Sequence, residues 1–320
     1  MSVTTISSRA CATRFLQANN MKHRLDVQGS STGNSHYEAL LECPRRARLS
    51  REKKAQSNTI HLTGTGTAVG TIGHGFMELY YGGKIRSPNE LNNIEFEPKG
   101  DFDLVIDPAT RSEATRLMGE YMTRFSPTSF GEVLFLERLM PKTDKEAEVV
   151  QAAVGIAPWT GRLDMGVRLT KKVAEALQLG FGLDVRPQKK YIVDFKFVKA
   201  EAATLKEQYV LSLQAMTYQM AMNAIEVAAG REPFAGMIFD VIIKTKEPKF
   251  RRYLAPAPAD PERAIVAERW RAVEVMAKNL DDWANTKACI PWFGEPCRFY
   301  TDSTCDRGVG DGLVRIGEMG

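Results

Sequence analysis

The sequence lacks the features that mark membrane proteins and secreted disulfide scaffolds. No apolar run approaches the roughly 20 residues that a membrane-spanning helix needs, so we expect a soluble chain. Only five cysteines occur in 320 residues, and this small odd number is typical of a reducing compartment such as the cytoplasm. No internal repeat is evident. A net charge of +4 permits an anionic partner without requiring one.

Acidic residues are absent from the first 25 positions, which carry three arginines and one lysine among many serines and threonines. A transit peptide can have this composition, but frayed polar ends are more common. We therefore expect a flexible tail at residues 1–35 and another at residues 306–320. Residues 36–305 are expected to form a single domain, because 43% of the chain is hydrophobic and can bury a full core.

Hydrophobic periodicity predicts alternating helices and strands in this domain. The predicted strands are Glu132–Leu139, Trp159–Leu169, Tyr191–Val198 and Gly236–Lys244. The predicted helices are Tyr37–Lys54, Ala68–Tyr81, Arg111–Arg124, Ala203–Ala228 and Glu262–Trp283. Residues 170–188, between the second and third strands, indicate an excursion at the edge of a sheet. This order favours an α/β fold in which helices flank a small mixed sheet.

The segment KKYIVDFKFVKA contains two charges that interrupt a strand pattern. Its aromatic and β-branched residues are typical of a strand, whose successive side chains point to opposite faces. One face is apolar, and the other carries Asp194 and Lys196 between Ile192 and Val198. Burying such charges without compensation costs several kcal/mol. The pair is therefore expected to serve a purpose beyond folding.

Two further polar side chains interrupt apolar patterns. Asp164 lies in the strand PWTGRLDMGVRL, behind a glycine that permits close backbone approach. Leu163, Val167 and Leu169 are expected to share the face opposite to it. Gln214 lies within an apolar helical stripe. One such residue alone is usually structural or exposed, but the four polar groups together form a pattern that needs a common explanation.

Two acids and a lysine on adjacent strands have a specific chemical use. Carboxylates from neighbouring strands can hold Mg²⁺, which keeps several waters and takes only one or two protein carboxylates. The cation lowers the pKa of a bound water and neutralises charge that develops on a phosphate. A lysine beside it can orient that water or stabilise the developing charge. Asp164, Asp194 and Lys196 therefore indicate metal-dependent attack on a phosphodiester.

Short motifs along the chain resemble, in their order, the PD-(D/E)xK nuclease superfamily in its RecB-like exonuclease branch. They are GTIGHGFMELYY, GRLD, VDFK and QAMTY, flanked by LLECPRRARL and CIPWFGEPCRFYTDSTC. The two flanks resemble the members that carry an iron–sulfur cluster, among them CRISPR-associated and phage-encoded exonucleases. The resemblance spans Tyr37 to Cys305. It departs from the family at Leu163, where a proline is usual, and in the long interval from Asp164 to Asp194.

This resemblance implies a restriction-endonuclease-like core with a metal site for Mg²⁺ or Mn²⁺. Asp164 and Asp194 would be metal ligands, and Lys196 would be the catalytic lysine. His74, in the motif GTIGHGFMELYY, would be an additional metal ligand, although a lone histidine beside an apolar helical stripe is usually a packing residue.

Three further residues take supporting roles under the same resemblance. Gln214 and Tyr218 would position DNA or the active-site loop. Glu137, in LFLERLM, would be a supporting carboxylate, and an exposed strand end is the alternative interpretation of it.

The cysteines give a separate inference. Cys289, Cys297 and Cys305 have seven residues between neighbours, Cys43 lies far upstream, and Cys11 falls in the polar tail. Four thiolates suit a [4Fe–4S] cluster or a Cys₄ zinc site, but the C-x₂₋₄-C pairs of compact zinc sites are absent. We expect a [4Fe–4S] cluster, with zinc or unliganded thiols as alternatives. It would form a C-terminal Cys-rich clasp, joining the segment around Cys43 to residues 289–305.

The basic run CPRRARLSREKK begins at Cys43. Arg45, Arg46 and Arg48 would contact DNA phosphates, since such contacts supply sequence-independent affinity, or would form a solvated helix face.

The expected function is that of a metal-dependent DNA exonuclease in replication, recombination or repair. It would act on single-stranded DNA or linear ends in the cytoplasm of a bacterial or phage-infected cell. A helicase or recombination protein is a possible partner. The alternatives are a structure-selective endonuclease and a non-catalytic iron–sulfur DNA-binding subunit.

Overall fold

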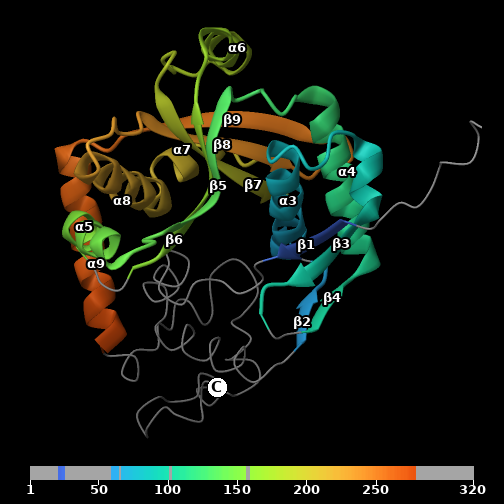
Figure 1. Ribbon diagram of the computed structural model, residues 1–320, viewed down its shortest axis with the longest axis horizontal. Helices are drawn as coiled ribbons and strands as arrows, with labels where there is room; N and C mark the ends of the chain where they lie inside the picture. Colours follow the sequence, from blue (N-terminus) through green and yellow to red (C-terminus); the bar gives the residue numbers. More distant parts are fainter. Residues whose placement is uncertain (1–20, 26–58, 65, 101–102, 156–158, 279–320) are drawn as a thin grey trace, which may run out of the picture.

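A five-stranded mixed sheet forms the centre of the molecule (Figure 1). The computed structural model describes residues 21–25, 59–64, 66–100, 103–155 and 159–278. The strands, in spatial order, are β5 (Glu132–Met140), β6 (Gly161–Arg168), β7 (Lys190–Val198), β8 (Gly236–Ile243) and β9 (Lys249–Pro256). β7 and β8 are parallel, and the other neighbours are antiparallel. The predicted mixed sheet is thereby confirmed, with β9 as a strand that the sequence patterns did not reveal.

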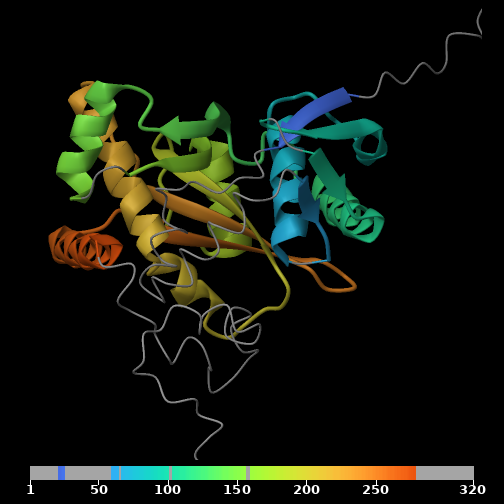
Figure 2. The same cartoon turned by 90° about the horizontal axis from the view of Figure 1, so that it is seen from below.

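Helices cover both faces of this sheet (Figure 2). The first layer contains α3 (Gly66–Tyr81), α4 (Pro108–Arg124) and α6 (Lys171–Phe181). The second contains α5 (Asp144–Val154), α8 (Leu213–Ala228) and α9 (Asp260–Lys278). Val193 and Phe195 of β7 pack in the first core cluster and Ile192 packs in the second, which confirms the alternation predicted for that strand. Among the described residues, no helix is long and apolar enough to cross a membrane.

The predicted helix Ala203–Ala228 is two helices. α7 (Leu205–Val210) ends before Leu211, and α8 begins after Ser212. Ser212 Oγ accepts a hydrogen bond of 3.1 Å from the backbone N–H of Ala215 and so caps the new helix. The prediction of one continuous helix was wrong because a capping serine satisfies the backbone where α8 starts.

The excursion predicted at residues 170–188 contains the helix α6. Thr170 Oγ1 caps its start through the N–H of Val173, and Gly182 ends it with a φ of 65°. Ala174 and Leu177 are buried on one side. Both capping residues are visible in the sequence, so this helix was predictable from its end signals.

Residues 21–25, which the sequence placed in a flexible tail, form the strand β1 (Met21–Leu25). β1 pairs in parallel with β3 (Ile94–Pro98), and β2 (Thr59–Leu62) pairs in the same way with β4 (Asp103–Ile106). A 3₁₀ helix, Pro88–Asn93, precedes β3. The pairing of β1 joins residues that are about seventy positions apart in the chain, a relationship without local sequence signals. The predicted helix Tyr37–Lys54 and the predicted clasp lie outside the described residues.

A buried ion pair joins helix α4 to the sheet. Arg252 of β9 donates to Asp240 of β8 at 3.2 Å, and Tyr121 of α4 donates to the same carboxylate at 2.6 Å. The guanidinium also lies 4.1 to 4.9 Å from the centroids of three rings, those of Phe125, Phe130 and Phe181. Hydrogen bonds and aromatic faces thus compensate both charges.

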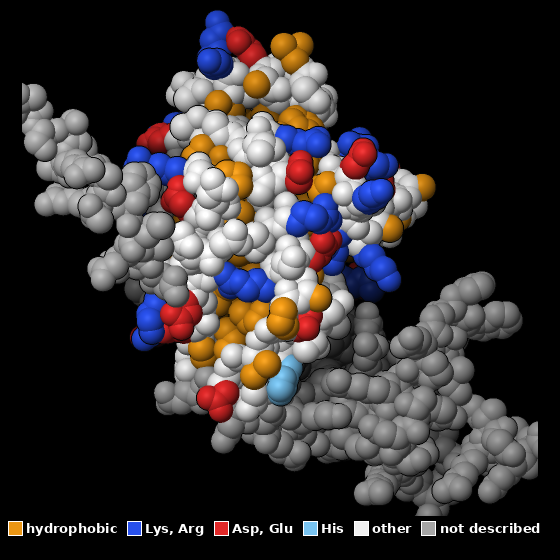
Figure 3. Space-filling model, turned by 90° about the vertical axis from the view of Figure 1, so that its right-hand side faces the viewer, with side chains coloured by type: hydrophobic (Ala, Val, Ile, Leu, Met, Phe, Trp, Pro, Cys, Tyr) orange, Lys and Arg blue, Asp and Glu red, His pale blue; other side chains and the backbone are white. Residues whose placement is uncertain are grey.

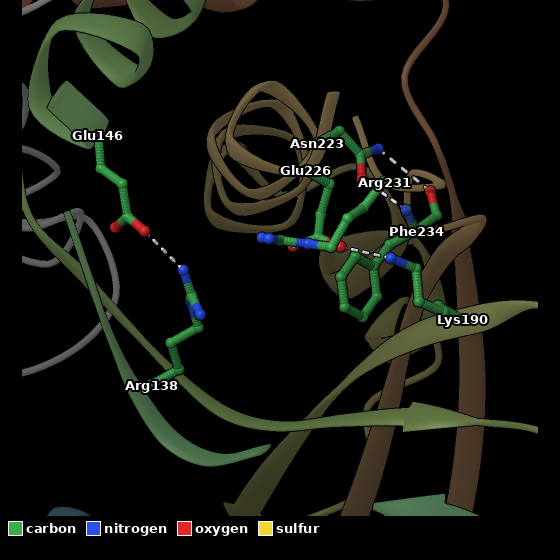
Figure 4. Close-up of polar contacts among 7 residues, drawn as sticks. All are labelled: Arg138, Glu146, Lys190, Asn223, Glu226, Arg231 and Phe234. Carbon is green, nitrogen blue, oxygen red and sulfur yellow. Dashed lines mark hydrogen bonds and ion pairs between the residues drawn. The ribbon is translucent and has the colours of Figure 1, made fainter. Parts of the chain in front are cut away.

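A second buried carboxylate, Glu226, joins the end of α8 to β7 (Figure 4). It accepts hydrogen bonds from Lys190 of β7 and from Arg231. Burial alone would raise the pKa of Glu226, but the hydrogen bonds from Arg231 and Lys190 hold it below its usual value. Figure 4 also shows Asn223 of α8 bonded to the backbone of Phe234, which fixes the loop after the helix.

We expect the substitution Glu226→Gln to lower the free energy of unfolding at neutral pH. The carboxylate has a lower pKa in the folded chain than in the unfolded chain, so its contribution is complete above the unfolded pKa and is lost as the pH falls through the folded one. Urea denaturation near neutral pH and in acid should show the gap between the wild type and this variant closing in acid.

Glu232→Gln is the matched control for that experiment, because its carboxylate is exposed and pairs with Lys189. It should change the free energy of unfolding little. A gap between the wild type and Glu226→Gln that stays constant with pH would contradict the prediction.

Candidate active site

The candidate site lies where strands β6 and β7 part. Their antiparallel pairing reaches as far as the rung Met165–Val193. Beyond that rung, Asp164 Oδ2 accepts a hydrogen bond of 2.8 Å from the backbone N–H of Phe195. The carboxylate takes the place of a strand carbonyl as the acceptor, and this fixes Asp164 at the end of the ladder.

His74 reaches the same carboxylate from helix α3. Its Nδ1 atom lies 3.2 Å from Asp164 Oδ2. Its ring lies beside Phe195 and Phe197, with centroid separations of 6.5 and 5.9 Å. Gly73 permits this approach, because a Cβ there would lie 2.2 Å from the ring of Phe197. The helix therefore packs closely enough on β7 for His74 and Asp164 to share one site.

His74 and Asp164 stabilise each other's charged forms. Burial lowers the pKa of His74, but the charge and hydrogen bond of Asp164 outweigh it and leave that pKa above its usual value. Burial raises the pKa of Asp164, but the charge and hydrogen bond of His74, the charge of Lys196 and the hydrogen bond from Phe195 together leave the pKa of Asp164 below its usual value.

Glu137 joins the site through an irregular point in strand β5. Its φ of 47° lies in the left-handed region, which is uncommon for residues other than glycine. The β5–β6 register on either side places it opposite Asp164. Leu136 packs in the first core cluster, whereas Arg138 bonds to Glu146 of α5 on the other face (Figure 4). Leu136 and Arg138 are two residues apart and would point to the same face in a regular strand. They point to opposite faces here, so the alternation of β5 is interrupted at Glu137.

The alternation of side chains along β6 is also interrupted, at Asp164, which lies opposite Glu137. Leu163 packs in the second core cluster, while Met165, Val167 and Leu169 pack in the first. The prediction that Leu163 shares a face with Val167 and Leu169 is therefore wrong. A strict alternation of period two does not hold across the point where Asp164 faces the left-handed residue of β5.

His74, Glu137 and Asp164 can form the ligand set of a divalent cation. Each offers one ligand atom, and these atoms all lie within 4.8 Å of one another. Burial and the charge of Asp164 raise the pKa of Glu137 to about 7, so a bound cation would favour its ionised form. The two carboxylate oxygens suit Mg²⁺ or Mn²⁺, whereas the imidazole nitrogen favours a transition-metal cation over Mg²⁺. Glu137 belongs to this group, whereas Asp194, a predicted ligand, does not.

Asp194 and Lys196 form a second part of the site together with Gln214 of α8. Lys196 Nζ lies 2.8 Å from Asp194 Oδ2 and donates to Gln214 Oε1 at 3.0 Å. Gln214 Nε2 lies 3.5 Å from Asp194 Oδ1. Although the ion pair is close, the buried Oδ2 accepts no well-aligned hydrogen bond from the part of the chain that the structure describes. A buried carboxylate oxygen in that state is a further candidate cation ligand.

The charges of the two parts act on each other. Burial raises the pKa of Asp194, and Asp164 raises it further against the opposing effect of Lys196. Burial lowers the pKa of Lys196, but Asp194 outweighs it and leaves that pKa above its usual value. Positive charge brought to this site would therefore relieve the repulsion between the carboxylates.

Tyr218 packs beside this second part. It is buried, and its ring lies edge-on to Trp159 at a centroid separation of 5.9 Å. Burial, together with the charge of Asp194, raises the pKa of Tyr218 to about 12. A Cβ at Gly161 would lie 2.9 Å from the tyrosine ring, so the glycine of the GRLD motif is required for this packing.

The patterns in the sequence did not reveal one residue of the site, Arg162. Its Nε atom lies 3.1 Å from Glu137 Oε2. Arg162 is part of the GRLD motif. Its pairing with Glu137 depends on how β5 aligns with β6, and a single sequence does not reveal that alignment. Among the described residues on the face shown in Figure 3, positive and negative side chains are interspersed.

Two predicted groups fall outside the described residues. They are the candidate DNA-binding residues Arg45, Arg46 and Arg48 and the candidate cluster ligands Cys43, Cys289, Cys297 and Cys305.

Comparison with known proteins defines the class. Residues 33–305 match the PD-(D/E)XK nuclease superfamily, and the chain belongs to that superfamily. Among solved structures, it is similar to a crystal structure of a protein from Eubacterium rectale named "Putative exonuclease", at 12% identity and a TM-score of 0.45. That similarity covers 96% of this chain and 100% of the other. No curated protein matches the chain. Members of the superfamily are hydrolases that cut DNA with divalent metal ions, so the cation-binding geometry agrees with the class.

We expect Mn²⁺ to raise the melting temperature of the full-length protein. A cation that binds only the folded chain adds about 2.7 kcal/mol at a concentration of 100 times its Kd. Differential scanning fluorimetry with Mn²⁺ and then excess EDTA measures the shift. The substitution Asp164→Asn should remove most of it, whereas Asp184→Asn, at an exposed carboxylate, should retain it. An equal shift in both variants would place the bound cation elsewhere.

Proposed function

We propose that the protein is a metal-dependent DNA exonuclease that hydrolyses phosphodiester bonds at DNA ends, in replication, recombination or repair. Membership of the superfamily supports the nuclease activity. The observation that carries the proposal is the convergence of a cation ligand set with a lysine at one end of the β6–β7 ladder. By the sequence resemblance, we place the chain in the RecB-like branch, with phage-encoded relatives.

In this mechanism, each residue near the end of the β6–β7 pairing has a separate role. A divalent cation would lower the pKa of an attacking water and polarise the scissile phosphate. His74, Glu137 and Asp164 would hold the cation, with Asp194 as a further ligand. Lys196 would stabilise the negative charge that develops on the phosphate. Gln214 supports Lys196 through its hydrogen bond to Nζ.

Digestion of end-labelled linear DNA and covalently closed circles distinguishes the proposal from its alternatives. An exonuclease degrades single-stranded or linear DNA with Mg²⁺ or Mn²⁺, spares closed circles and is inactive in EDTA. Cutting of circles at the rate of linear DNA would instead support a structure-selective endonuclease. Binding without any cleavage would support a non-catalytic iron–sulfur DNA-binding subunit.

We expect Asp194→Asn to abolish cleavage while the protein still folds and binds DNA, because the nearly isosteric amide removes a metal ligand and a buried charge. Lys196→Ala should keep metal binding and reduce cleavage by about two orders of magnitude or more, the scale for losing one positioned electrostatic group. Gel shifts, which weaken as salt rises, report DNA binding.

The competing interpretation of these two residues is a structural ion pair. In that case, breaking the pair would destabilise the chain, and both variants would lose DNA binding and solubility together. A folded, DNA-binding Asp194→Asn protein with wild-type cleavage would exclude this site from the reaction.

We further propose that Cys43, Cys289, Cys297 and Cys305 bind a [4Fe–4S] cluster. Four cysteines in the order of the iron–sulfur members support it. Arg45, Arg46 and Arg48 follow the first ligand and would contact DNA phosphates. We place the protein in the cytoplasm of a bacterial or phage-infected cell, with a helicase or recombination protein as its partner, since reduced thiols persist there.

Protein purified without oxygen should therefore be brown, absorb broadly in the visible and contain iron. Cys297→Ala should lower solubility and stability more than it alters the cleavage by the protein that still folds, because metal–thiolate binding energy is folding energy in such sites. Visible spectra and metal analysis check both statements. Colourless protein with stoichiometric zinc would overturn the cluster assignment.

A further inference from the structure

Glu137 has a partner that is separate from the three-residue ligand set. Arg162 Nε lies 3.1 Å from Glu137 Oε2, and the two side chains are 33% and 16% exposed. Arg162 precedes Asp164 by two residues on β6, and its backbone is paired with that of Leu139. The ion pair therefore runs diagonally between the strands and ends on a carboxylate that faces Asp164 and His74.

The backbone at Glu137 is strained, and the strain has a consequence for the side chain. A glutamate with φ of 47° is disfavoured by contact between its Cβ and the backbone. Such outliers persist where the surrounding structure determines them, and they cluster at functional sites. Here, the exchange of faces at this residue brings the carboxylate beside the ligand atoms of His74 and Asp164.

The same two strands contain a second ion pair of the same type. Arg168 of β6 lies 3.0 Å from Glu132 of β5, directly opposite in the register. This pair is more exposed, at 41% and 58%, and lies at the end of the β5–β6 pairing where β5 begins, away from the ligand set. A cross-strand Arg–Glu pair thus occurs here without a ligand set. Arg162 differs from Arg168 because its partner, Glu137, belongs to the candidate ligand set.

We propose that Arg162 is a positioning residue of the cation site. By binding Oε2, it fixes the plane of the Glu137 carboxylate so that its other oxygen can reach a cation shared with His74 and Asp164. Partners of metal ligands act in this way, by orienting the ligand and fixing its charge. The inference rests on the proposed metal-dependent function and assigns Arg162 a part in metal affinity.

The test is Mn²⁺ titration of the full-length protein by isothermal titration calorimetry, without DNA. Arg162→Gln should weaken Mn²⁺ binding by about 10-fold or more, the range for loss of a ligand's partner. Its melting temperature without metal should stay near that of the wild type, because the guanidinium is partly exposed. Arg162→Lys keeps the positive charge and should recover most of the affinity. Arg168→Gln, the matched control, should bind Mn²⁺ as the wild type does.

Several outcomes of the titration would overturn the inference. Wild-type affinity in Arg162→Gln would show that Glu137 needs no partner. Tighter binding in that variant would show that Arg162 competes with the cation. An equal loss in Arg168→Gln would show a general effect of cross-strand pairing. If Arg162→Gln unfolds, the Mn²⁺ affinity of Arg162→Lys tests the inference, with Glu137→Gln titrated beside it as a variant that lacks the ligand carboxylate. An affinity of Arg162→Lys as low as that of Glu137→Gln would exclude positioning by the charge.

Failure of this inference is distinguishable from failure of the proposed function. If the wild type cuts DNA and Asp194→Asn does not, while Arg162→Gln binds Mn²⁺ normally, the function stands and the role of Arg162 falls. If the wild type binds Mn²⁺ and Arg162→Gln does so weakly, yet no DNA is cut, the role of Arg162 stands and the nuclease proposal falls. A wild type that binds no Mn²⁺ overturns the role of Arg162 outright.

Discussion

The hydrogen bond from the backbone of Phe195 to Asp164 is the interaction on which the site depends. A buried strand N–H needs an acceptor, and here the ladder partner is a side-chain carboxylate instead of a carbonyl. The charge of that carboxylate is compensated by His74, which requires α3 to pack closely on β7. The same hydrogen bond therefore extends the strand pairing and fixes Asp164 in the site, so the candidate site lies where the regular β6–β7 pairing ends.

The buried charges of the described residues differ in how completely they are compensated. Asp240 and Arg252 are enclosed by hydrogen bonds and three phenyl rings, and Glu226 binds two cationic side chains. Asp194 has a close ammonium, but its inner oxygen accepts no aligned hydrogen bond within the described part of the chain. Buried polar groups are ordinarily satisfied, and an exception needs an explanation. Within the described residues, Asp194 therefore retains a carboxylate oxygen that could serve as a further cation ligand beside the set of His74, Glu137 and Asp164.

Local patterns in the sequence predicted the elements that carry this site. Alternation placed Asp194 and Lys196 on the same face of β7, and periodicity located the helix of His74, because both features are read over adjacent residues. The ends of α6 were also visible as capping residues. The pairing of β1 with β3 was not, since it joins distant segments. The assignment of Leu163 failed because it extrapolated a regular strand across an irregular rung.

The identity of residue 137 is the feature that local reasoning was least able to interpret. A left-handed backbone position is least costly for glycine, and asparagine or aspartate tolerates it better than other residues do. A bend in β5 alone would therefore be served better by glycine. Glutamate gains nothing there as a backbone residue, so its side chain must offset the strain. Its carboxylate meets Arg162 and the potential ligand residues His74 and Asp164, which ties the irregularity of the strand to the site.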